Sequence, residues 1–329
     1  MVPMTTEGAM MPTIEELVAI KQQVEQHYID QPGVTGIDVG YKEVGGELTN
    51  QIAVRVHVAR KTDDIPADQR VPEEIHGAVT DVLERVYELH VTSLPVASLA
   101  DAKHYSPLLG GVSMGPSRAI GGSIFAGTLG AVVVDNESQA RAALTNFHVA
   151  AVDATGQAGD RMVQPSRIEH GKVPQDEFGA TLRLVLSDHV DGAVISIDEH
   201  RQTSCDIVEI GGVRGTKTAA LGMAVRKRGR TTELTRGSVD GISATVQVDY
   251  GEGLGVHTLR DQVSITAATS PDAVFSDHGD SGSAIVDEQG FVVALLFAGS
   301  GANTVGNPIA SVLQELNVSM CTGGPDSHH

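Results

Sequence analysis

The chain has 329 residues, a formal net charge of −19 and two cysteines, Cys205 and Cys321. The acidic charge repels phosphate backbones, so we expect no nucleic acid partner. The cysteines lie far apart in the sequence and form no Cys-x-x-Cys pair, so nothing suggests a disulfide framework, a thiol redox motif or a cysteine-rich zinc site. The 13 histidines include no His-Glu-x-x-His spacing, and we expect neither a metal nor a cofactor.

The N-terminus predicts a cytoplasmic protein. Residues Met1–Glu7 lack the basic and apolar runs of a signal peptide. No apolar stretch approaches the roughly 18 residues of a membrane span, so no membrane partner is expected. Homo-oligomerisation is left open, since no motif bears on it.

Residues 1–104 predict a small α/β domain. Apolar residues at helical spacing favour one helix over residues 13–29, and Thr13 with Glu16 fits a capping box at its start. Alternating apolar residues predict strands at 34–41 and 52–58. Residues 79–86 fit either a third strand or a short helix.

From about residue 105 the pattern changes to that of a mainly β protein. Short apolar runs, bounded by Gly, Asp and Ser, occur at residues 130–134, 193–197, 239–248 and 291–297. This rhythm is typical of antiparallel barrels or sandwiches. One further helix is expected at residues 309–316.

Residues 279–283, with the sequence Gly-Asp-Ser-Gly-Ser, are suited to nucleophilic catalysis. Acyl transfer by serine needs an exposed hydroxyl and backbone N–H groups aimed at the developing oxyanion. Gly279 lets the backbone present its N–H without a Cβ, and Gly282 lets the chain turn away after Ser281. The same residues also make a good turn, so the motif alone leaves both interpretations open.

Two further residues complete a candidate catalytic set. His148 lies at the end of an apolar strand, where a general base could face a cleft. A single histidine in this setting is more often a core residue bonded to backbone. Asp191 begins another apolar strand and is suited to hold the tautomer of the base. Asp188 is a nearby competitor, but it lies in the loop before that strand.

The three residues occur in the order His148, Asp191 and Ser281, and the chain also contains Thr145-x-x-His148 and the Gly-Asp-Ser-Gly loop. With these features, residues from about 105 to 320 resemble a trypsin-like (chymotrypsin-clan) serine protease. The resemblance implies two antiparallel six-stranded barrels. The first barrel, residues 105–205, would carry His148 and Asp191, and the second, residues 206–329, would carry Ser281 and end in the helix. The backbone N–H groups of Gly279 and Ser281 would form the oxyanion hole, and the substrate would be a protein or peptide.

A closer resemblance involves residues 228–232 and 234–237. They are similar to a bacterial group of trypsin-like proteins that is related to the plant narrow-leaf protein. That group usually has Gly where this chain has Glu233, so the local turn is expected to differ. The basic cluster at residues 226–230 is better explained as the first strand and turn of the second barrel than as a nucleic acid site.

The same resemblance places a substrate pocket around Phe275, His278, Phe297 and Gly299. Phe275 stands at the position of the pocket base, six residues before the nucleophile. Since it carries no charge, cleavage after Lys or Arg is not expected, and a small or apolar residue is favoured. An alternative of equal weight is that Phe275 fills the core beside the loop.

Activation of animal family members depends on a new N-terminus that pairs with the Asp of the nucleophile loop, here Asp280. Ile120-Gly121-Gly122 faintly resembles such a start, but we expect internal hydrogen bonds to hold Asp280 instead. The favoured function is a serine endopeptidase. The alternative is a catalytically latent protease fold that acts as a binding or assembly module. An α/β-hydrolase is disfavoured, because the Gly-x-Ser-x-Gly motif and its residue order are absent.

Overall fold

The computed structural model describes residues 12–62, 65–66, 69–90, 92–93, 101–251, 253–268, 273–301 and 303–323. The chain divides into two compact units, Met1–Arg85 and Val86–His329. The first unit ends earlier than the expected boundary at residue 104, because residues 88–89 and 92–93 pair with strands of the second unit. The stretch Met1–Glu7, where no signal peptide was expected, lies outside the described residues.

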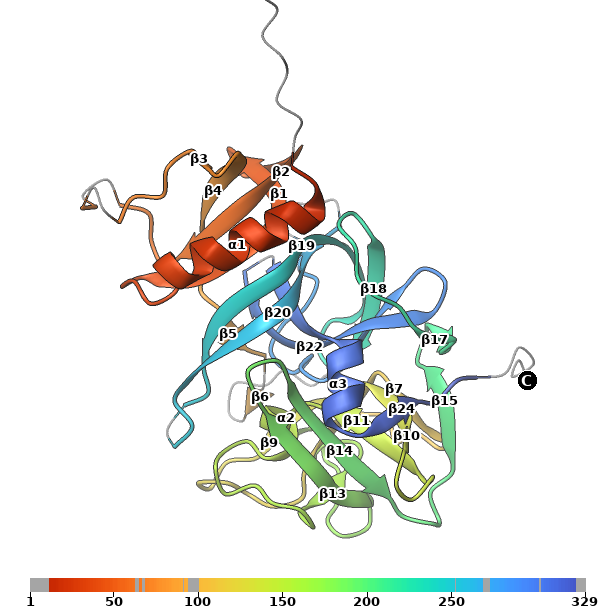
Figure 1. The fold of residues 1–329 in the computed structure, drawn as a ribbon. Coiled ribbons are helices and arrows are strands. Elements are labelled where there is room, and N and C mark those ends of the chain that lie inside the picture. The colour runs from red at the N-terminus through yellow and green to blue at the C-terminus, as the bar shows by residue number, and fades with distance from the viewer. Residues whose placement is uncertain are drawn as a thin grey trace, which may run out of the picture. The chain divides into compact units, whose positions relative to one another are not determined.

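The first unit packs one helix on a small sheet (Figure 1). Helix α1 (Ile14–Tyr28) begins at Thr13, and the predicted capping box with Glu16 is present. Strand β1 (Val34–Val44) pairs antiparallel with β2 (Glu47–Val58), which pairs in parallel with β4 (Ala78–Glu84). Strand β3 (Glu74–Ile75) follows at the edge. Of the two alternatives for residues 79–86, the structure therefore shows the strand.

The second unit is mainly β, as predicted, and contains two larger sheets. The first has the strand order β24-β10-β11-β14-β13-β12-β8-β9-β6. Its strands are β6 (Thr92–Ser93), β8 (Val112–Pro116), β9 (Phe125–Leu129), β10 (Ala131–Asp135), β11 (Arg141–Thr145), β12 (Arg161–Val163), β13 (Glu177–Leu186), β14 (Asp191–Ile197) and β24 (Val318–Met320).

In the other sheet the pairings return to their starting strand. Strand β18 pairs with β21, which leads through β22, β23 and β20 to β19, and β19 pairs with β18 again. These strands are β18 (Ala224–Gly229), β19 (Glu233–Asp249), β20 (Val256–Ala267), β21 (Ala284–Asp287), β22 (Phe291–Ser300) and β23 (Asn303–Pro308). The basic cluster thus belongs largely to β18, as expected.

Shorter elements complete the unit: α2 (Phe147–Ala150), the 3₁₀ helix η1 (Arg167–Glu169), α3 (Ile309–Glu315), β5 (Glu88–Leu89), β7 (Leu108–Gly110), β15 (Thr203–Ile207), β16 (Gly211–Gly212) and β17 (Gly215–Thr216). A large core cluster joins the two sheets. It combines Leu144 and Val194 of the first sheet with Ala284 and Leu295 of the second and Val312 of α3. The strand ends that carry the candidate catalytic residues border this core.

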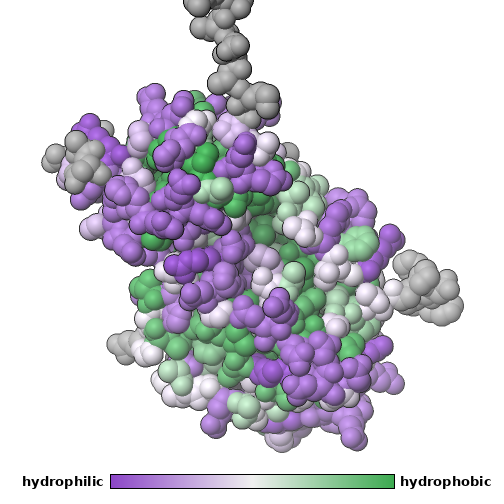
Figure 2. Space-filling view, viewed as in Figure 1, coloured by the Kyte–Doolittle hydropathy of each residue, from purple (hydrophilic) through white to green (hydrophobic). Residues whose placement is uncertain are grey.

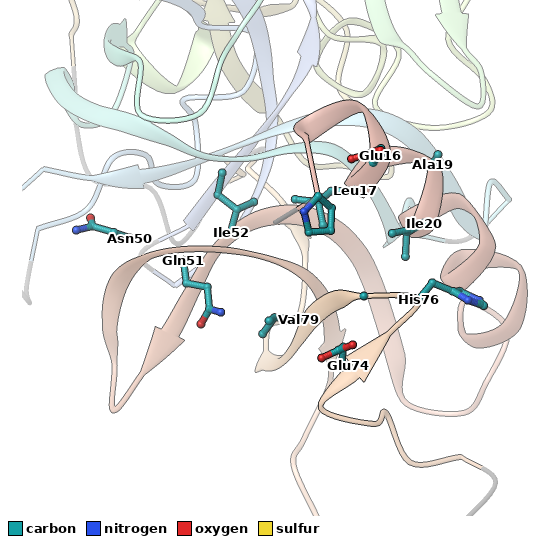
Figure 3. Close-up of a pocket in the computed structure, with 12 residues that line it drawn as sticks. Glu16, Leu17, Ala19, Ile20, Asn50, Gln51, Ile52, Glu74, His76 and Val79 are labelled. Atoms are coloured by element: carbon teal, nitrogen blue, oxygen red, sulfur yellow. The ribbon is translucent and has the colours of Figure 1, made fainter. Parts of the chain in front are cut away.

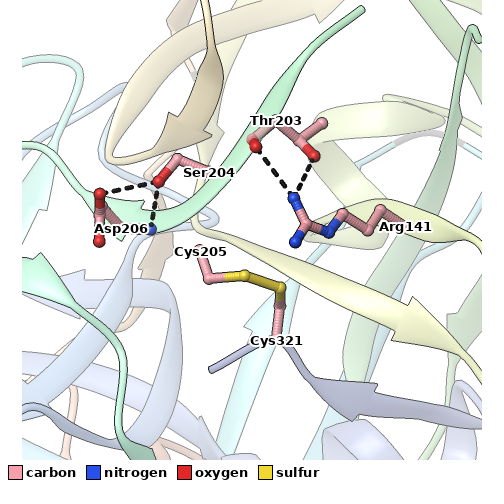
Figure 4. The surroundings of a disulfide bond; sticks show 6 residues. All are labelled: Arg141, Thr203, Ser204, Cys205, Asp206 and Cys321. Atoms are coloured by element: carbon pink, nitrogen blue, oxygen red, sulfur yellow. Dashed lines mark hydrogen bonds between the residues drawn. A yellow bond between two sulfur atoms is a disulfide. The ribbon is translucent and has the colours of Figure 1, made fainter. Parts of the chain in front are cut away.

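The two cysteines are bonded to each other, contrary to the expectation from their separation. Cys205 of β15 and Cys321, directly after β24, form a disulfide across 116 residues of sequence (Figure 4). The backbone N–H of Cys321 also donates to the carbonyl of Val132 in β10. Because these pairings connect distant parts of the chain, sequence spacing held no sign of the contact.

On the face drawn in Figure 2, hydrophilic residues surround smaller hydrophobic areas. Among the described residues, no helix is both long enough and apolar enough to cross a membrane.

Candidate active site

Strand pairing brings His148 and Asp191 together. Strands β11 and β14 run antiparallel with Thr145 opposite Ala193, so the residues just beyond that pair are neighbours. His148 lies in the short helix α2 directly after β11, rather than on the strand end itself. Its Nδ1 lies 2.5 Å from Asp191 Oδ2, and its backbone N–H donates to Oδ1 at 3.2 Å. Both side chains are almost completely buried.

Asp191 is fixed by further partners that the sequence did not reveal. The hydroxyl of Tyr250 donates to Asp191 Oδ2 at 2.9 Å, and the side chain of Asn146 donates to its carbonyl. Burial, reinforced by Asp191, raises the pKa of Tyr250 well above its usual value, so the phenol is neutral and donates. The competitor Asp188 is exposed and pairs with Arg260.

Ser281 lies in a tight loop before β21, and both flanking glycines have left-handed backbones. The φ angles are 102° at Gly279 and 92° at Gly282, a region that favours glycine. A Cβ on Gly282 would collide with the carbonyl of Thr128 and the hydroxyl of Thr145. The loop therefore packs directly on the strands that precede His148.

Two threonine contacts tie this loop to β9. The backbone N–H of Thr128 donates to the Ser281 carbonyl at 2.8 Å, and its hydroxyl donates to the Gly279 carbonyl at 2.9 Å. The hydroxyl of Ser281 donates to the carbonyl of Phe297 at 3.1 Å. His148 Nε2 is buried and has no hydrogen-bond partner among the described residues. The structure thus forms the His–Asp contact, while the serine hydroxyl is engaged elsewhere.

Asp280 is held by internal hydrogen bonds, as expected. Its carboxylate accepts from the backbone N–H groups of Thr231 and Thr232, from the Thr232 hydroxyl, and from the N–H of Asp277. The buried ammonium of Lys227 lies 3.3 Å from Oδ2. The nucleophile loop is therefore ordered without an inserted N-terminus.

The turn after this cluster contains a non-glycine residue with a left-handed backbone. Glu233 has φ +53°, the left-handed conformation in which L side chains are strained. Glu233 thus stands at a position where glycine would be unstrained, and the expected difference from the bacterial group stays a prediction.

The expected pocket residues lie in different surroundings. Phe275 and Phe297 are fully buried in two separate core clusters, so of the two roles left open for Phe275 its packing matches the core role. His278 is exposed, and its ring lies 5.4 Å from that of His90. A Cβ on Gly299 would collide with the same His90 ring. The Gly279 N–H, an expected oxyanion donor, donates to the His90 carbonyl at 2.5 Å.

His90 is thus a residue of the site that sequence analysis missed. It has no motif around it, and it lies 281 − 90 = 191 positions before Ser281 in the sequence. Its neighbours in the pocket, Ser276 and Thr304, were missed for the same reason. Ser276 contacts the His90 ring and the Thr304 hydroxyl, and both partners are distant from it in the sequence.

A separate cavity of about 680 Å³ lies within the first unit (Figure 3). Side chains of α1, including Leu17 and Ile20, and of the sheet, including Ile52 and Val79, line it. Its few ionisable residues are Glu16, Glu74 and His76, and none of the three candidate catalytic residues borders it. Among the described residues, no group of three or more His, Cys, Asp or Glu side chains is arranged to hold a metal.

No protein-family model and no curated protein sequence matches the chain. Among solved structures it is similar to Thermobifida fusca protease A, at 20% identity and TM-score 0.48, with 65% of this chain and 98% of that chain covered. It is also similar to Nocardiopsis protease (17%, 0.47, 65% and 98%) and Cellulomonas bogoriensis chymotrypsin (19%, 0.45, 67% and 100%).

The printed names of these neighbours are those of proteases, one of them a chymotrypsin. The narrower link to the narrow-leaf protein stays a prediction. At such identities and TM-scores the likeness carries no argument about activity, which depends on the geometry of the site itself.

Proposed function

We propose that this chain is a serine endopeptidase with Ser281 as nucleophile, His148 as general base and Asp191 as the residue that orients the base. The observation that carries the proposal is the buried contact of 2.5 Å between His148 Nδ1 and Asp191 Oδ2. It leaves Nε2 as the ring nitrogen available for proton transfer. The carboxylate is held in turn by Tyr250, so the orientation of the base is fixed before substrate arrives.

The reaction requires the Ser281 hydroxyl to leave the Phe297 carbonyl and to donate to His148 Nε2. Catalytic hydrogen bonds often form only in the substrate complex. The Oγ atom then attacks the substrate carbonyl carbon while His148 takes its proton, and the N–H groups of Gly279 and Ser281 stabilise the oxyanion. The protonated His148 gives the proton to the leaving amine. Water, activated by the same ring, hydrolyses the acyl-enzyme and restores Ser281.

The proposed architecture is a chymotrypsin-like pair of six-stranded barrels, with residues 105–205 in the first and 206–329 in the second. The circular pairing from β18 back to β19 supports the second barrel. For the first, the support is the continuous antiparallel sheet from β8 to β14. The first unit would form the small α/β domain that precedes them.

The proposed substrate is a protein or peptide, and the mechanism invokes no cofactor, nucleic acid or membrane. Homo-oligomerisation remains untested. The cytoplasmic location stays a prediction, and the Cys205–Cys321 bond opposes it, because disulfides persist mainly in oxidising compartments. Alkylation of the protein as isolated from its cells, followed by mass spectrometry, would show whether these thiols are free.

A latent binding module is the second candidate, because two proposed catalytic groups form hydrogen bonds with other residues of the chain. The Ser281 hydroxyl donates to Phe297, and the Gly279 N–H donates to His90. The cavity of the first unit would offer such a module a binding site. The intact pairing of His148 with Asp191 favours the enzyme.

The test is covalent labelling with a fluorophosphonate, at long reaction times and high reagent concentration. The wild type should label, and Ser281→Ala and His148→Ala should not. Ser319→Ala, at an exposed serine of β24, is the matched control and should label like the wild type. The variant His90→Ala removes the side chain of the residue whose carbonyl accepts from Gly279. If the folded wild type and this variant both stay unlabelled, the latent module would be established instead.

A further inference from the structure

Residues 88–90 add a strand to the edge of β22. In β5, Leu89 lies opposite Ala298 and Glu88 opposite Gly299, in antiparallel register. The His90 N–H lies 3.4 Å from the Phe297 carbonyl and donates to it. Strand β21 pairs with the earlier part of β22, so β5 takes the part of this edge that β21 leaves free. Adding a strand to such an edge is a common mode of peptide recognition.

The carbonyl of His90 accepts a hydrogen bond from the Gly279 N–H, which is one of the two proposed oxyanion donors. The Gly279 N–H lies 2.5 Å from it, in the loop that presents Ser281. In a bound substrate, the carbonyl at this position belongs to the residue whose peptide bond is cut. The chain therefore presents the carbonyl of His90 where a substrate would present its reactive carbonyl.

The side chain of His90 fills a small polar pocket and is 7% exposed. Its Nδ1 lies 3.0 Å from the Ser276 hydroxyl, which contacts the Thr304 hydroxyl at 2.6 Å. Gly299 forms the wall against the ring, since a Cβ there would meet the imidazole. The pocket thus matches a planar side chain that exchanges a hydrogen bond with a hydroxyl.

The described residues 92–93 pair with a different strand from the one that pairs with residues 88–89. Thr92 lies opposite Ala126 in β9, and β9 is the strand whose Thr128 donates to the Ser281 carbonyl. The segment therefore pairs with β22 before His90 and with β9 after it.

We propose that Glu88–His90 is a built-in inhibitor that occupies the substrate groove as a substrate does, with His90 in the primary specificity pocket. The inference deepens the proposed endopeptidase function and depends on it. It also names the substrate class: peptides with histidine, or a similar planar hydrogen-bonding side chain, before the cut. We expect the bond after His90 to stay intact, because the Ser281 hydroxyl donates to the Phe297 carbonyl rather than to His148.

The first experiment compares rates of fluorophosphonate labelling. His90→Ala removes the ring that anchors the segment, so labelling should be at least tenfold faster than in the wild type. Gly299→Ala expels the ring from the opposite wall and should act in the same direction. His200→Ala, at an exposed histidine, is the control and should match the wild type. Equal rates in all four proteins would overturn the inhibitor while leaving the endopeptidase intact.

The second experiment measures binding without chemistry, in a Ser281→Ala background. The peptide acetyl-Tyr-Glu-Leu-His-amide, which copies residues 87–90, should bind the His90→Ala chain at least tenfold more tightly than the chain with His90. Equal affinities would refute occupancy of the groove whatever the outcome of labelling. Intact mass should show no cleavage after His90 in the wild type, and a cleaved chain would make the segment a substrate rather than an inhibitor.

Discussion

The two sides of the proposed catalytic site differ in the hydrogen-bond partners of their catalytic groups. On the side of β11 and β14, His148 and Asp191 make the contact that proton transfer requires, with a buried phenol behind the carboxylate. On the side of β21 and β22, the Ser281 hydroxyl and the Gly279 N–H are bonded to other parts of the chain. In the proposed endopeptidase, control would therefore lie in access to the nucleophile, since the base is already oriented.

The largest effect should come from removing the reacting groups themselves. In the groove-open variant His90→Ala, with acetyl-Tyr-Glu-Leu-His p-nitroanilide as substrate, Ser281→Ala or His148→Ala should each lower kcat by about 10⁶. The double variant should lose no more than either single one, because the two groups act as a unit. Additive losses would contradict a shared mechanism, and circular dichroism would check that each variant is folded.

The next largest effect should come from Asp191, which orients His148. Asp191→Asn keeps the shape but places an amide beside Nδ1, which favours the wrong tautomer of His148. In triads this change costs about 10⁴ in kcat. Asp188→Asn, at the exposed neighbour, is the matched control and should leave turnover unchanged. A small effect of Asp191→Asn would mean that another group orients the base.

Acidification should release His90 from its pocket beside the nucleophile loop. Burial lowers the pKa of His90 to about 4, with a smaller contribution from His278, while Asp277 and Asp280 oppose the shift and His148 adds to it. Because the docked ring is neutral, docking is strongest above the ordinary histidine pKa of about 6.5. Docking weakens as the pH falls from there to about 4, and the ratio of docked to undocked segment decreases by on the order of a hundredfold.

NMR titration of the His90 ring in the Ser281→Ala background would measure this directly. The expected midpoint lies near 4 in the docked chain. A midpoint near 6.5, with unchanged exposure of the segment across the range, would show that the pocket does not hold a neutral ring.

The smallest effect concerns the phenol behind the carboxylate. Tyr250→Phe removes one hydrogen bond to Asp191, worth about 1 kcal/mol. In the groove-open background kcat should fall about fivefold and KM should stay unchanged, because the loss concerns the base and not the pocket. Tyr41→Phe in the first unit serves as the control. A change in KM with constant kcat would place Tyr250 in substrate binding instead.

Local signals in the sequence were sufficient for several elements. The capping box at Thr13 and the helical spacing after it predicted α1 almost to its ends. Runs of small and branched apolar residues predicted β10, β14 and β22, because a strand buried on both faces needs no polar alternation. The order of His148, Asp191 and Ser281 was readable since each residue stands in a short motif of its own.

The remaining parts of the site depend on contacts between distant residues. His90 contacts Gly279 at a separation of 279 − 90 = 189 positions in the sequence. The local sequence around either residue does not predict the other. Tyr250 stands after a long strand where no pattern distinguishes it from a core aromatic. Cys205 and Cys321 likewise meet only after β24 has joined β10. Such pairs follow from topology, which composition and periodicity leave undetermined.

The pairing of β5 with β22 has a consequence for competition. The segment is covalently attached to the groove that it fills, so its effective concentration there is set by the chain and not by the amount of protein. Short tethers give values on the order of millimolar. A free peptide of equal intrinsic affinity would have to reach a similar concentration to displace it, so dilution of the protein would not activate the enzyme.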